Sequence, residues 1–137
     1  MARPPALPGL LLLSLLAATG GWPSGSLAAT TLLASHYSGT LYTLTLTGNA
    51  SSAAGTAKLA ITSQLRAGGT MPSWLTLDSA ARTLYVTDES SFGGASLTAL
   101  SVSADGSLKV TGTARTTGGE LHSGLYGEHG GFIAVAE

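Results

Sequence analysis

The chain of 137 residues contains no cysteine and little charge. The absence of cysteine excludes a disulfide scaffold, a thiolate zinc site and a cysteine nucleophile. Charged residues make up only 9% of the chain, the formal net charge is −1, and there is no basic run. We therefore expect no nucleic-acid partner and no electrostatic attachment to an anionic membrane. Proline is also scarce, since only Pro72 follows Pro23.

The N-terminal residues have the order of parts found in a secretory signal peptide. Arg3 precedes an apolar stretch over 7–18, and glycine and proline residues end this stretch. Ser26-Leu27-Ala28 follows, and its two small residues, Ser26 and Ala28, suit the −3 and −1 positions of a cleavage site. A membrane span needs about 20 apolar residues, and this stretch is shorter. The sequence thus predicts a signal peptide over 1–28, cleaved near Ala28. The mature chain, 29–137, is expected to be secreted and free of the membrane.

A second feature agrees with an extracellular location. Asn49-Ala50-Ser51 is an N-x-Ser sequon within a stretch rich in Gly, Ala and Ser. Such a stretch reads as a loop, where a glycan can be attached. We therefore expect Asn49 to be glycosylated, making the mature protein a glycoprotein.

Beyond residue 30 the hydrophobic pattern has a period of two. Leu and Val alternate with Thr, Ser and Tyr over 42–47, 74–77, 83–87 and 100–103. This alternation is typical of half-buried strands, and no window favours an amphipathic helix. Asp105-Gly106 predicts a tight two-residue hairpin, and Gly39 and the segment 78–82 mark further turns. The expected fold class is all-β.

The strands recur in a fixed order. Residues 68–75 resemble 118–125 at an offset of 50, and 84–89 resemble 132–137 at an offset of 48. In the same way, segment 32–35 matches 84–87 and segment 41–46 matches 97–102. A repeat of about 50 residues made of short strands predicts the blades of a β-propeller.

The length allows few such blades. Without its leader the chain provides about two blades and the start of a third, whereas a propeller needs roughly 4–8. Two blades cannot close a ring and would leave apolar faces and strand edges uncovered. We therefore expect the chain to be an N-terminal fragment of a larger propeller.

Four segments carry a family resemblance: 72–78, 82–89, 96–102 and 104–108. Their residues are similar to the blade signature of the lactonase, or cycloisomerase 2, family of seven-bladed β-propellers. That family includes 6-phosphogluconolactonase-like proteins and the fungal carboxy-muconate cyclases. The resemblance implies acid–base chemistry on a cyclic ester, with a sugar lactone, a muconolactone or a related carboxylate as the small-molecule substrate. It implies no cofactor.

The resemblance also implies one catalytic residue in this chain. In the family a histidine after a Gly-Gly loop faces the central cleft, and here His122 follows Gly118-Gly119. Histidine suits proton transfer because its ordinary pKa lies near neutrality. The chain departs from the family pattern at Ala136-Glu137, where a Tyr or Asn is usual. The expected Arg and Glu partners would come from later blades, so the chain alone is expected to be inactive.

Structural alternatives stand beside these assignments. His122 can be a blade-edge residue whose ring is satisfied by backbone groups, and a non-catalytic propeller that binds a protein or carbohydrate partner remains the second function. His36 and His129 are expected in exposed loops. Asp88-Glu89 is interpreted as part of a solvated loop, with a position lining the central cleft as the alternative. We expect the three aromatic side chains of Trp74, Tyr85 and Phe132 to pack between blades.

A metal site built from Glu120, His122, Glu128 and His129 matches no standard ligand spacing. The Gly-Gly pairs are not followed by a lysine or a helix, and no G-x-S-x-G occurs, which excludes a phosphate-binding loop and a nucleophile elbow.

Overall fold

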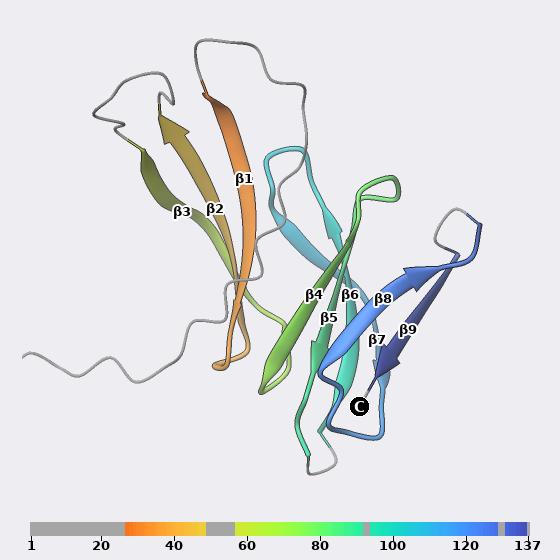
Figure 1. Ribbon diagram of the computed structural model, residues 1–137. Coiled ribbons are helices and arrows are strands. Elements are labelled where there is room, and N and C mark those ends of the chain that lie inside the picture. Colours follow the sequence, from red (N-terminus) through yellow and green to blue (C-terminus); the bar gives the residue numbers. More distant parts are fainter. Residues whose placement is uncertain (1–26, 49–56, 92–93, 129–130, 137) are drawn as a thin grey trace, which may run out of the picture.

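The computed structural model describes residues 27–48, 57–91, 94–128 and 131–136. These residues form nine strands in three antiparallel sheets (Figure 1). The first sheet contains β1 (Leu27–His36), β2 (Thr40–Gly48) and β3 (Lys58–Arg66); the second contains β4 (Pro72–Asp78), β5 (Thr83–Asp88), β6 (Ser96–Val102) and β7 (Leu108–Arg115); the third contains β8 (His122–Tyr126) and β9 (Phe132–Ala136). The described residues include no helix, so the prediction of an all-β fold is confirmed.

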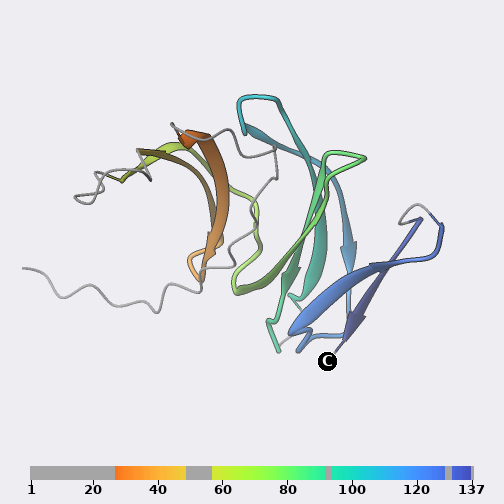
Figure 2. The same ribbon diagram turned by 45° about the horizontal axis from the view of Figure 1, so that its top comes forward.

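The three sheets follow one another as the blades of a propeller do. In each sheet the strands are ordered as in the sequence, and every neighbouring pair is antiparallel. The first strands, β1, β4 and β8, lie side by side, and the sheets spread outward from them (Figures 1 and 2). We call this row of three strands the inner edge.

The sequence repeat coincides with this arrangement. Segments offset by 50 and 48 residues are β4 with β8 and β5 with β9, the first and second strands of their sheets. The other two matches relate β1 to β5 and β2 to β6. The first sheet thus corresponds to the second, third and fourth strands of the second sheet. A strand equivalent to β4 is missing from the first sheet among the described residues.

Short turns connect the strands where glycine was expected. The loop between β1 and β2 closes when the Gly39 N–H donates to the His36 carbonyl at 2.9 Å, with Gly39 at φ +81°. The β6–β7 turn differs from the prediction. Its closing residues are Ser103 and Ser107, so three residues form the loop rather than two. Only Gly106 takes a positive φ, +82°, while the Asp105 carboxylate accepts hydrogen bonds from Ser107. This is the three-residue hairpin that ends in a left-handed glycine.

The apolar core joins the first two sheets. It consists of Leu33, Leu41, Leu75, Leu84, Val86 and Leu100, of which Leu100 is fully buried. Each such side chain stabilises the fold by roughly 1.5–3 kcal/mol through burial. The core cluster draws on β1, β2, β4, β5 and β6 and on no strand of the third sheet. The third sheet is therefore held mainly by polar contacts to β4.

Hydroxyl groups connect neighbouring sheets. Thr43 Oγ1 donates to the Gly106 carbonyl at 2.7 Å, which joins β2 to the β6–β7 turn. Ser73 Oγ donates to the Glu120 carbonyl at 3.0 Å, and Thr76 Oγ1 donates to the Ser123 carbonyl at 2.8 Å. Thr43 is almost completely buried although it belongs to the polar half of the alternating pattern. A buried threonine is tolerated here because the adjacent sheet provides its hydrogen-bond acceptor.

Several sequence predictions lie wholly or partly outside the described residues. The signal peptide falls mostly within residues 1–26, and the sequon at Asn49 falls within 49–56. The predicted cleavage site near Ala28 lies at the start of β1, before the continuous pairing with β2 that begins at Thr30. Cleavage there would leave that pairing intact. Within the described ranges, the structure has no helix of a length and hydropathy that could cross a membrane.

Candidate functional site

His122 lies at the inner edge, where the resemblance places a catalytic histidine. It is the first residue of β8, and its side chain is exposed. Its ring lies against the indole of Trp74 on β4, with ring centroids 4.2 Å apart and planes tilted by 41°. The contact crosses from the second sheet to the third, which confirms that Trp74 packs between blades. An exposed imidazole held on an aromatic surface has a defined position and remains open to a substrate.

The other two aromatic predictions have different outcomes. Phe132 is 63% exposed and stacks on Tyr126 of the same hairpin, with ring centroids 5.3 Å apart. The expectation that Phe132 packs between blades is therefore wrong within the described structure, because its contact is local to β8 and β9. Tyr85 is half-buried on β5.

A tyrosine and a glutamate meet at the same end of the sheets as His122. Tyr37 is in the β1–β2 turn, and Glu89 directly follows β5. A hydrogen bond to the Glu89 carboxylate, together with burial and the negative charge of Glu89, raises the pKa of the Tyr37 hydroxyl. Tyr37 therefore stays protonated and acts as a donor. No local sequence pattern predicts this pair, because 52 positions separate the two residues and only the packing of two sheets brings them together.

Asp88, expected in a solvated loop, is one of the most buried residues. Its side chain is 1% exposed, and its Oδ2 accepts from the Thr70 N–H at 2.9 Å. Its Oδ1 accepts from the Met71 N–H at 2.9 Å and from the Ser90 hydroxyl at 2.6 Å. The carboxylate thus fixes the loop that leads into β4 to the end of β5. The solvated-loop interpretation is wrong, because these amide and hydroxyl groups replace water around the charge.

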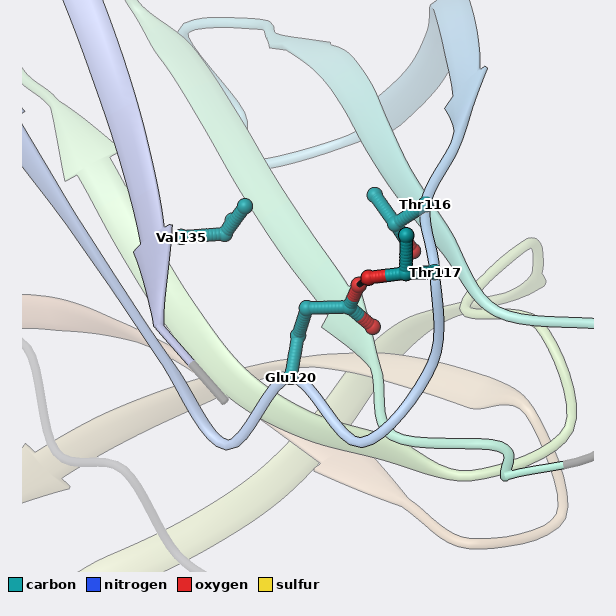
Figure 3. Close-up of a pocket in the computed structure, with 4 residues that line it drawn as sticks. All are labelled: Thr116, Thr117, Glu120 and Val135. Atoms are coloured by element: carbon teal, nitrogen blue, oxygen red, sulfur yellow. Dashed lines mark hydrogen bonds between the residues drawn. The ribbon is translucent and has the colours of Figure 1, made fainter.

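The Glu120 carboxylate borders a pocket at this end of the molecule. Thr116, Thr117, Glu120 and Val135 line a cavity of about 500 Å³ between the loop after β7 and strand β9 (Figure 3). Glu120 is only 2% exposed. Its Oε1 accepts from the Gly118 N–H at 3.0 Å and from Thr117 Oγ1 at 3.4 Å, whereas Oε2 is buried and has no hydrogen-bond partner. From the sequence, Glu120 is considered only as a possible metal ligand, and no local pattern predicts this arrangement.

Burial and hydrogen bonding act in opposite directions on the pKa of Glu120. Burial raises it, but hydrogen bonds from backbone N–H groups, that of Gly118 foremost, outweigh this effect and leave the pKa below its ordinary value. The side chain is therefore ionised at neutral pH. Among the described residues, no group of three or more His, Asp or Glu side chains is placed to hold a metal ion.

His36 ends β1, and its Nδ1 accepts from the Ser38 N–H at 3.0 Å, so its role is in the turn. At the opposite end of the sheets lies a cavity of about 370 Å³, between the β4–β5 turn and the β8–β9 turn. It includes Asp78 and the exposed Tyr126 ring. His129 lies outside the described residues.

These features define a class of protein. Successive antiparallel sheets whose strands follow the order of the sequence, and whose first strands lie side by side, are the elements of a β-propeller. The family model for the lactonases, described as "Lactonase, 7-bladed beta-propeller", matches residues 28–137. The chain belongs to this family, which confirms the resemblance seen in the sequence. No curated protein and no solved structure matches it.

Proposed function

We propose that this chain forms blades of a secreted lactonase or cycloisomerase that acts on a cyclic ester. The observation that carries the proposal is the lactonase family match over 28–137, combined with the exposed His122 on the inner edge. The substrate would be a sugar lactone or a muconolactone. Its ring opening or closure requires a proton to move to or from the ring oxygen or the carbon next to the carboxylate.

In this proposal His122 transfers the proton, and Trp74 positions its ring. The cation that binds a substrate carboxylate or phosphate, and a further carboxylate, would come from other blades of the ring. The described residues form three sheets of three, four and two strands, which cannot surround an axis as seven blades do. This supports the assignment of the cation and the further carboxylate to other blades. The chain by itself is expected to be inactive.

The test is lactone hydrolysis by the protein encoded by the complete reading frame that contains this chain. His122→Ala should lower kcat about 100-fold or more, since proton transfer by a positioned side chain contributes roughly 10²–10⁴-fold. His36→Ala is the matched control, because that imidazole is engaged in a turn, and it should leave turnover unchanged. Unchanged turnover in His122→Ala would remove His122 from the mechanism.

The same assay separates the second candidate function, a propeller that binds a carbohydrate or protein without catalysis. That function is favoured by the stacked and exposed Tyr126–Phe132 pair, which lies beside the second cavity. Exposed aromatic rings offer apolar area to a sugar or a partner side chain. A complete protein that hydrolyses no sugar lactone or muconolactone would favour this alternative.

Secretion and glycosylation at Asn49 are part of the proposal, and secretion is tested on the expressed protein. Secretion predicts a mature N-terminus near residue 29 in the culture medium, read by N-terminal sequencing. A mature N-terminus at Met1, in protein retained by the cell, would contradict it.

A further inference from the structure

Two contacts between neighbouring sheets lie at the same end of the molecule. Trp74 and His122 join the second sheet to the third. Tyr37 and Glu89 join the first sheet to the second. The β1–β2 turn, the end of β5 and the start of β8 are found together at this end in both views (Figures 1 and 2). The second contact thus lies beside the one that carries the histidine of the proposed reaction.

The backbone places Glu89 at the level of His122. The Glu89 N–H donates to the Met71 carbonyl at 3.0 Å, directly before the start of β4 at Pro72. The repeat offset of 50 residues relates Pro72 to His122, the first residue of β8. Strands β4 and β8 lie side by side, and packed sheets are roughly 10 Å apart. The side chains of Glu89 and His122 can therefore contact a ligand of monosaccharide size from two sides.

The tyrosine beside Glu89 is held in place by its own turn. The Gly39 carbonyl accepts from the N–H groups of Ala67 and Gly68 at 3.1 and 3.0 Å, which attaches the β1–β2 turn to the loop before β4. The Tyr37 hydroxyl donates to the Glu89 carboxylate. This bond orients the carboxylate and uses one of about four acceptor positions on its two oxygens. Glu89 is only half-buried, so a ligand can reach the other positions.

The Glu89 carboxylate has no cation bound to it. Among the described residues, no lysine, arginine or histidine forms an ion pair with it. Such a carboxylate repels an anionic ligand, and it accepts strong, charge-assisted hydrogen bonds from hydroxyl groups. A sugar lactone carries several hydroxyl groups, whereas a muconolactone carries a carboxylate and no hydroxyl. The charge beside His122 thus favours the sugar lactone.

We propose that Glu89, oriented by Tyr37, binds hydroxyl groups of the substrate and makes the site selective for a sugar lactone over a muconolactone. This selectivity rests on the proposed lactonase function and narrows its substrate. Glu89 contacts the substrate but takes no part in proton transfer, and Tyr37 is a positioning residue. His122 remains the group that moves the proton.

The test is hydrolysis of D-gluconolactone and of δ-valerolactone, which has the same six-membered ring and no hydroxyl groups. The enzyme is the protein encoded by the complete reading frame. Glu89→Gln should raise KM for gluconolactone about tenfold or more and leave kcat unchanged, because it weakens a charge-assisted bond to the bound substrate. KM for δ-valerolactone should not change. Glu128→Gln removes the same charge from an exposed position beyond the other end of β8 and should alter neither KM.

Tyr37→Phe is a second variant, which retains the carboxylate. Without the hydroxyl group the carboxylate loses its orientation, so KM for gluconolactone should rise severalfold while kcat stays the same. A purely structural role of Tyr37 would instead lower kcat for both lactones.

The outcomes separate this selectivity from the proposed function. An unchanged KM for gluconolactone in Glu89→Gln would overturn the role of Glu89, and so would an equal rise for both lactones. Hydrolysis of muconolactone without hydrolysis of gluconolactone would overturn the selectivity and leave the proposed lactonase function standing. A wild-type protein that hydrolyses neither would contradict the proposed function, and the selectivity with it.

Discussion

At the scale of single residues, buried carboxylates organise the end of the molecule that carries His122. Asp88 and Glu120 are both at most 2% exposed, but they are satisfied differently. Asp88 uses both oxygens to accept from Thr70, Met71 and Ser90, whereas Glu120 leaves one oxygen unpartnered. The first fixes the loop before β4 to the end of β5, and the second fixes the loop between β7 and β8. Sequence alone could not make this distinction, because both residues appear as acids next to turns.

The structural role of Asp88 leads to a stability prediction. Asp88→Ala should lower the free energy of unfolding by about 2–4 kcal/mol, because it leaves the N–H groups of Thr70 and Met71 and the buried Ser90 hydroxyl without their charged acceptor. Asp78→Ala is the control, since the described bond of that carboxylate is to one turn N–H, that of Ala81. Its cost should be about 1 kcal/mol or less. Urea denaturation measures both variants, and equal losses would contradict the role assigned to Asp88.

At the scale of strands and turns, much of the structure could be predicted from the sequence. The two-residue alternation identifies β2, β4, β5 and β6, and the offsets of 48 and 50 relate the correct strands of different sheets. These features are local, because each depends on a strand and the turn beside it. The face that becomes buried was not predictable in the same way. Thr43 is buried only because Gly106, 63 positions further on, provides its acceptor.

The β6–β7 turn provides a test of packing between the first two sheets. A Cβ added at Gly106 would lie 2.7 Å from the Thr43 methyl group and 2.9 Å from the Thr31 methyl group, at a φ of +82°. Gly106→Ala should therefore destabilise the chain by about 1–3 kcal/mol through backbone strain and overpacking. Gly112→Ala in β7 is the matched control, because an added Cβ there meets nothing within 4 Å.

Thermal or urea denaturation of the two glycine variants distinguishes the effects. Gly112→Ala should be nearly neutral, since the added methyl group enters open space and restricts the unfolded chain. If Gly106→Ala were equally neutral, the turn would not be packed against the first sheet. That result would also place in doubt the hydrogen bond from Thr43 to the Gly106 carbonyl.

At the scale of the whole molecule, the three sheets are stabilised unequally. The first two share the leucine-rich core, whereas the third contributes no residue to that core. The third sheet and the residue before it also expose large apolar side chains: the exposed fractions of Leu121, Tyr126, Phe132 and Val135 lie between 38% and 63%. It is joined to β4 through the Thr76–Ser123 and Ser73–Glu120 hydrogen bonds and the Trp74–His122 contact. His122 thus lies on the least stable sheet of the described structure.

This inequality predicts the order of amide hydrogen exchange in the full chain. Amides of β5 should exchange most slowly, because this strand is paired on both sides and contains the buried Leu84 and Val86. Amides of β9 should exchange fastest among the strands, since β9 pairs only with β8 and lacks core contacts. Strand β7 is also an edge strand, but it belongs to the four-stranded sheet and should be intermediate. Protection of β9 equal to that of β5 would mean that the third sheet unfolds together with the core, and that contacts across β4 and β8 couple the site at His122 to global stability.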